Sequence, residues 1–157
     1  MYRASNQLIC TFLRCGRRLG ANSSLGQVVR LEELLKKSRE EVIDIWLAYH
    51  SDAQGCRVGS VLSSQECDTF AARAAESPMF VLPLSKPAGY ETLLVQCQMP
   101  YVLVTGLEEF KRSARTVTEL LRAFYISSED YQLVHTFNHQ PAKFDFGALL
   151  RKLNIQA

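Results

Sequence analysis

The alternation of apolar and polar residues predicts four helices. Apolar residues recur at helical spacing over residues 31–50, 63–77, 116–125 and 145–153. Two of these segments begin with a Ser/Thr-x-x-Glu capping box, formed by Ser63 with Glu66 and by Thr116 with Glu119. In a capping box each of the two side chains accepts a hydrogen bond from the backbone N–H of the other residue, which fixes the first turn. We also expect Asp145 to cap the last helix.

Four shorter apolar runs predict strands, at residues 79–84, 91–98, 101–105 and 132–137. Residues 51–60 are expected to form a loop. Because the first three strands are joined by short connections, they should pair antiparallel. The fold class is therefore α+β, with a small, mainly antiparallel sheet and helices packed on one face. Pro83 has no N–H for a sheet ladder, so its strand should lie at an edge or carry a bulge there.

The segment from Met1 to Leu31 differs in charge from the rest of the chain. It holds five arginines and no Asp or Glu, whereas the whole chain has 18 basic and 16 acidic residues. On a helix, Leu8, Phe12 and Leu19 would share a face opposite Arg14 and Arg17. An Arg-rich amphipathic segment without acids is typical of a mitochondrial transit peptide. We therefore expect a transit peptide and linker at 1–25 and a single α+β domain at 26–157; a disordered basic tail or an ordinary first helix are the alternatives.

The composition narrows the class of function. With 47% apolar and 22% charged residues, the chain is typical of a soluble globular protein. No apolar run approaches the roughly 20 residues that a membrane-spanning helix needs, so we expect no membrane insertion. A phosphate-binding GxxxxGK[ST] loop and a GxSxG nucleophile motif are both absent. Basic and aromatic residues do not interleave in the way that is typical of single-stranded nucleic-acid binding. We expect no cofactor and no nucleic-acid partner.

The positions of the histidines and cysteines in the sequence do not indicate a metal site or a catalytic site. His135 and His139 are four residues apart, a spacing that would place both on one face of a helix, but the pattern there predicts a strand. We therefore expect solvated or locally hydrogen-bonded histidines and no metal site. His50 ends the first helix without a visible catalytic partner. The five cysteines form no CxxC pair, and Cys67 and Cys97 lie on apolar faces, where we expect them to be buried.

Several blocks, taken in order, resemble one family of proteins. They are Glu40 to His50 (EEVIDIWLAYH), Pro78 to Leu84 (PMFVLPL) with Gly89-Tyr90 and Gln96, Phe124-Tyr125, and Leu133 to Asn138 (LVHTFN). This set is similar to the mitochondrial assembly factors often called the ATP eleven family. Family members carry a longer segment between the strands at 91–98 and 101–105, where this chain has only Met99 and Pro100. Fewer strands would leave an apolar sheet edge unpaired.

The resemblance implies a function. It implies a non-enzymatic, monomeric chaperone of the mitochondrial matrix that binds the unassembled β subunit of the ATP synthase catalytic head and prevents its aggregation until it joins the α subunit. Our candidate contact, by strand addition, consists of Phe80, Leu82, Pro83, Leu84 and Tyr90. The alternative for these residues is plain sheet core. The alternative functions are a small α+β enzyme that uses His135 or His50 with a carboxylate, and a truncated isoform without chaperone activity.

Overall fold

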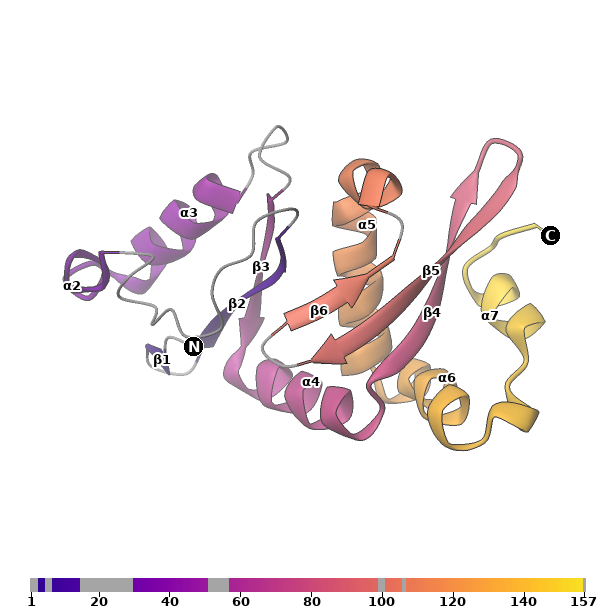
Figure 1. Cartoon of the computed structure of the whole chain (residues 1–157). Helices are drawn as coiled ribbons and strands as arrows, with labels where there is room; N and C mark the ends of the chain where they lie inside the picture. Colours follow the sequence, from indigo (N-terminus) through magenta and orange to yellow (C-terminus); the bar gives the residue numbers. More distant parts are fainter. Residues whose placement is uncertain are drawn as a thin grey trace. The chain divides into compact units, whose positions relative to one another are not determined.

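The computed structural model describes residues 3–4, 7–14, 30–50, 57–98, 101–105 and 107–156. The chain divides into two compact units, Met1–Cys67 and Asp68–Ala157, whose elements are labelled in Figure 1. We call them the N-terminal unit and the C-terminal unit and describe each by itself. In the described part of the chain, no helix is long and apolar enough to cross a membrane.

The N-terminal unit contains an antiparallel sheet in the order β1-β2-β3. Its strands are β1 (Arg3–Ala4), β2 (Gln7–Arg14) and β3 (Arg57–Ser63). The helix expected over the leader is therefore wrong for residues 7–14, and the loop expected at 51–60 is wrong from residue 57 on. Strand β3 pairs with β2, from Gln7 opposite Ser63 to Arg14 opposite Arg57. In the described part of the chain between these strands there are two helices, so a local pattern cannot reveal the pairing of β2 with β3. Cleavage of the leader stays a prediction.

The helix expected at 31–50 is two helices, α2 (Leu31–Leu34) and α3 (Arg39–His50). A capping box that the sequence analysis missed separates them: the Ser38 N–H donates to Glu41 Oε2 at 2.8 Å, and the Glu41 N–H donates to Ser38 Oγ at 3.3 Å. The bond from the Ser38 N–H also lowers the pKa of Glu41. Val42 is buried, but Ile45 and Tyr49 are exposed, so the predicted apolar stripe is buried only in part.

Helix α4 (Ser64–Glu76) begins where the sequence predicts. The Ser63 N–H donates to Glu66 Oε2 at 2.7 Å, and the Glu66 N–H donates to Ser63 Oγ at 3.2 Å. The predicted capping box is thus confirmed, and the helix ends two residues before Pro78.

The C-terminal unit contains the sheet that the sequence predicts. Strands β4 (Met79–Lys86), β5 (Gly89–Gln98) and β6 (Tyr101–Val104) pair antiparallel in the order β4-β5-β6. Gly89 at the hairpin has a φ of 96°, a conformation that side chains with a Cβ adopt rarely. With helices against one face of this sheet, the predicted α+β class is confirmed.

The helices of this unit are α5 (Leu107–Ile126), α6 (Ser128–His139) and α7 (Phe146–Lys152), with a 3₁₀ turn at Pro141–Lys143. Figure 1 shows α5 lying behind the sheet. Phe80 occupies the centre of the core: its ring centroid lies 5.0 Å from that of Phe124 on α5 and 5.9 Å from that of Phe137 on α6. Aromatic pairs at such distances add to the stability that burial provides. Asp145 lies at the predicted N-cap position of α7, but its side chain makes no capping hydrogen bond there.

Two predictions for this unit are wrong. Thr116 does not open a helix but lies inside α5, which begins at Leu107 and is kinked at Ser113. Residues 132–137, expected as a strand, belong to α6. The hydroxyl of Ser127 accepts from the Asp130 N–H at 3.4 Å and caps that helix. Tyr131 and Val134, three residues apart, are its buried positions, a spacing that a short apolar run does not reveal.

Strand β4 is an edge strand, as Pro83 predicts. The side chain of Asn138 accepts from the Met79 N–H at 3.0 Å and donates to the Met79 carbonyl, so the polar groups of Met79 point away from β5. The register with β5 is uninterrupted, and backbone groups alternate in direction along a strand. The backbone nitrogen of Pro83, four residues after Met79, therefore also points away from β5. The proline removes an edge donor and no bond of the ladder.

Candidate partner surface and candidate metal site

One face of the C-terminal sheet carries exposed apolar side chains. Along β5, Leu93, Val95 and Cys97 point into the core, and the alternating positions point the other way. Among these, Tyr90 is 37% and Leu94 38% exposed. Leu103 of β6, paired with Gln96 on the same side, is 51% exposed. We call Tyr90, Leu94 and Leu103 the open sheet face.

The residues expected to contact a partner divide into two groups. Phe80, Leu82 and Leu84 are at most 4% exposed, and Pro83 is buried as well. The sheet-core alternative describes these four. Tyr90 is the member of the set at the surface, and its ring also lies 5.9 Å from that of Phe146 on α7.

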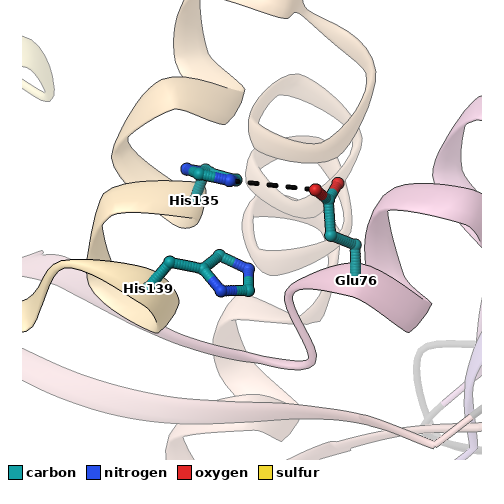
Figure 2. Close-up of side chains that lie close together, drawn as sticks. All are labelled: Glu76, His135 and His139. Atoms are coloured by element: carbon teal, nitrogen blue, oxygen red, sulfur yellow. Dashed lines mark ion pairs between the residues drawn. The ribbon is translucent and has the colours of Figure 1, made fainter.

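A second group of side chains gathers where α4 ends beside α6 (Figure 2). Glu76, His135 and His139 each direct one potential ligand atom toward the others, and the three atoms lie within 4.8 Å of one another. His135 Nε2 and Glu76 Oε1 are 3.8 Å apart. The two imidazole rings are 4.4 Å apart between centroids. The expectation that the histidines do not share a face is thus wrong, because α6 is a helix.

Hydrogen bonds from buried neighbours hold this cluster. The Tyr131 hydroxyl donates to Glu76 Oε2 at 2.7 Å. Ser77, fully buried, has its Oγ 2.9 Å from the Tyr131 hydroxyl and 3.3 Å from His139 Nε2. Burial raises the pKa of Tyr131, and the hydrogen bond with Ser77 opposes that shift. The side chains of the cluster therefore lie against Ser77 and Tyr131, two residues that are held in place by the packed interior.

Arg73 brings a positive charge close to the cluster, but its guanidinium is engaged elsewhere. The planar group stacks over the Tyr131 ring at 4.6 Å. Its Nη1 donates to the carbonyls of Tyr125, Ile126 and Ser127, at 2.8 to 3.2 Å, and its Nη2 donates to the Ser128 hydroxyl. Arg73 thus satisfies the carbonyls of Tyr125 and Ile126, which the end of α5 leaves without helical partners. The Ser127 carbonyl also accepts from the Tyr131 N–H of α6.

Glu76 is the member of this cluster that no sequence pattern reveals. It lies on α4, and the whole β4-β5-β6 sheet and α5 come between it and His135 along the chain, so no local motif links them. A signal for half of the site was present, since two histidines four apart form a ligand pair on a helix. This signal was not used, because residues 132–137 were predicted to form a strand.

The structure bears on the enzyme alternative at His135, at one surface hollow and at His50. His135 does have a carboxylate neighbour, Glu76, but both lie at the surface. A hollow on the surface of α5 is lined by other residues, which are Glu119, Arg122, Ala123, Ile126 and Ser127. His50 belongs to the N-terminal unit, where it is buried against the ring of Trp46 at 4.7 Å. Cys67 and Cys97 are buried, as predicted.

Comparison with known proteins adds a relationship. A relative from Danio rerio, described as ATP synthase mitochondrial F1 complex assembly factor 1, is 25% identical over 172 residues. The match covers 84% of this chain and 56% of the relative, so the chain spans about half the length of the curated relative. No solved structure matches. The family model described as ATP11 protein matches residues 20–125, and the chain belongs to this family.

Proposed function

We propose that this protein is a mitochondrial assembly factor for the F1 part of ATP synthase. It would hold the unassembled β subunit in solution until the α subunit joins it. The family match over residues 20–125 carries this proposal, and the name of the Danio rerio relative supports it. The role is non-enzymatic, because holding an unassembled subunit requires binding and release and no bond-making step.

The open sheet face is the surface we propose for the β subunit. An unassembled subunit exposes apolar area that its neighbour later covers, and a chaperone must offer apolar area in return. Tyr90, Leu94 and Leu103 supply it from two adjacent strands. The partly buried Val81 lies opposite Leu94 on β4 and extends the same face. The α subunit would end the interaction by covering the same surface of β.

The proposed place of action is the mitochondrial matrix. The five arginines between Met1 and Leu31, with no acid among them, support an import signal. The remainder of the chain carries more acidic than basic groups, so the positive charge is concentrated in that leader. The protein would act there as a monomer.

Co-expression with the partner tests the proposal. The full chain is produced together with the mitochondrial ATP synthase β subunit, without α, and the soluble fraction is analysed by size-exclusion chromatography. We expect a co-eluting complex. A β subunit that stays insoluble beside a folded chain would contradict the proposal and favour the truncated isoform without chaperone activity.

A matched pair of variants locates the surface. Leu94→Asp combined with Leu103→Asp places two charges on the open sheet face and should abolish co-elution. Leu35→Asp changes a leucine that is 60% exposed in the N-terminal unit and should leave co-elution intact. Circular dichroism checks that each variant is folded. Equal binding by both would show that the partner lies elsewhere.

A further inference from the structure

We propose that Glu76, His135 and His139 bind one divalent transition-metal ion, with Zn²⁺ as the best match. This site is independent of the proposed assembly function, because none of its residues lies on the open sheet face.

The spacing of the ligand atoms fits one ion. Zinc binds nitrogen at about 2.0–2.1 Å and carboxylate oxygen at about 2.0–2.2 Å, so two ligands of a tetrahedral ion lie roughly 3.4 Å apart. His135 Nε2 and Glu76 Oε1 are 3.8 Å apart, and all three atoms lie within 4.8 Å. Closing the site to that geometry takes movements of about 1 Å. Because Glu76 and His139 are exposed, their side chains can rotate by that amount without disturbing the core.

The donor set selects the class of metal. Two imidazole nitrogens and one carboxylate oxygen suit zinc, copper or nickel, whereas calcium and magnesium prefer oxygen ligands throughout. Three protein ligands leave a fourth position for water or for a side chain of another molecule. The arrangement is thus an open site, at the surface of the C-terminal unit.

The surroundings are those of a built site. The Tyr131 hydroxyl binds Glu76 Oε2 and leaves Oε1 directed at His135. Ser77 lies within hydrogen-bonding distance of His139 Nε2. The Tyr131 contact would orient Glu76 from the outer shell, and the loss of such a contact typically costs about 10–100-fold in affinity. Ser77 and Tyr131 are both at most 7% exposed, so these supports come from the packed interior.

The positive charge of Arg73 opposes the binding of a metal ion less than an isolated guanidinium would, because it is partly offset by its own partners. The Arg73 guanidinium donates to three carbonyls and one hydroxyl at the junction of α5 and α6. The end of a helix carries a partial negative charge that offsets a cation placed there. The simpler alternative, an ion pair between His135 and Glu76, uses two of the three residues and leaves His139 to its contacts with Ser77 and the His135 ring.

Spectroscopic titration tests the proposal directly. The full chain is freed of metal with a chelator and titrated with Co²⁺, whose visible absorption reports tetrahedral coordination, and Zn²⁺ is then added as a competitor. We expect one Co²⁺ per chain, displaced by Zn²⁺, without the near-ultraviolet band of cobalt–thiolate bonds. A thiolate band would place the metal on cysteines and overturn the proposal, as would the absence of binding.

Substitutions assign the ligands. His139→Ala and Glu76→Gln should each weaken Zn²⁺ binding by about 10-fold or more, and Tyr131→Phe by about 10-fold. Glu129→Gln alters a carboxylate on the same helix α6 that contacts Lys152 instead and should leave the affinity unchanged. Equal affinity in the double variant His135→Ala/His139→Ala would contradict the assignment.

Thermal unfolding gives a second, independent measurement. An ion that binds the native state and is present at about 100-fold above its Kd should raise Tm by about 5–10 °C for a chain of this size. The shift should disappear in His139→Ala, whose exposed side chain is not needed for folding. A shift that persists in that variant would show that the metal acts elsewhere.

Discussion

Among single residues, Tyr125 shows how the core of the C-terminal unit accommodates a polar group. Its ring is fully buried against Phe70, with 5.0 Å between centroids, and its hydroxyl donates to the carbonyl of Ser77 at 2.9 Å. Burial raises its pKa far above the usual range. The hydroxyl thus stays protonated and keeps its hydrogen bond.

Removing this hydroxyl should destabilise the fold. Tyr125→Phe keeps the ring but leaves a buried carbonyl without one partner, and we expect a loss of about 1–2 kcal/mol in the free energy of unfolding. Urea denaturation followed by circular dichroism measures the change. Tyr90→Phe, at an exposed ring, is the control and should change stability by less than about 0.5 kcal/mol. Equal effects would show that the buried hydrogen bond contributes nothing.

Cys97 offers a test of burial. Burial raises the pKa of its thiol, so in the folded state less of the reactive thiolate forms at a given pH. We expect Cys97 to resist iodoacetamide at about pH 8 in the native protein and to react in urea, as mass spectrometry of the peptides would show. Rapid labelling of the native protein would contradict the burial of this residue.

The same raised pKa values predict how stability varies with pH. The folded protein holds the protons of Cys97 and Tyr125 more tightly than the unfolded chain does. This contribution to stability is complete below the unfolded pKa values, about 8.5 for Cys and about 10 for Tyr, and is lost as pH rises above them. The urea midpoint should therefore fall between about pH 8 and about pH 10.5, and the fall should be smaller in Cys97→Ala.

For the elements, the sequence was sufficient for the C-terminal sheet and for α4, where the signals are local, but the local capping box at Thr116 misplaced the start of α5. The strands at 79–84, 91–98 and 101–105 follow from apolar runs bounded by turns, and α4 follows from its capping box. It was insufficient where distant partners decide. Strand β3 depends on pairing with β2, and α6 depends on burying Tyr131 and Val134 against the rest of the unit. The candidate metal site needs both α6 and Glu76 of α4, so it could not be predicted.

Asn138 connects two of these elements and can be tested. Its side chain bonds the N–H and the carbonyl of Met79 and also donates to the Val134 carbonyl at 2.8 Å. We expect Asn138→Ala to cost about 1–3 kcal/mol and to speed hydrogen exchange at the Met79 amide. Gln132→Ala, at an exposed position of the same helix, is the control. Unchanged exchange at Met79 would show that the contact does not protect the strand.

For the whole molecule, the sequence predicts one domain after a leader, and the structure divides into two units between Cys67 and Asp68. The division follows from β2, which pairs with β3 within the first unit. The distribution of charge along the chain, by contrast, can be read from the sequence alone, because it does not depend on which distant segments pair. It is the basis for the proposed import signal.

Import into isolated mitochondria tests that signal. The radiolabelled full chain should enter in the presence of a membrane potential and become shorter. Replacing Arg14, Arg17 and Arg18 with Gln removes three of the five arginines between Met1 and Leu31 and should reduce import several-fold. Arg151→Gln, near the other end of the chain, is the control. Import of an uncleaved chain would contradict a removable leader.

The closed edge of β4 limits how the C-terminal sheet can grow. Asn138 occupies its first outward position and Pro83 removes a donor from a later one, whereas within the described ranges no further strand of this sheet lies beyond β6. An extended strand of another molecule therefore meets an occupied position and a missing donor at β4. Growth of the sheet in both directions, which a fibril requires, is obstructed at this edge.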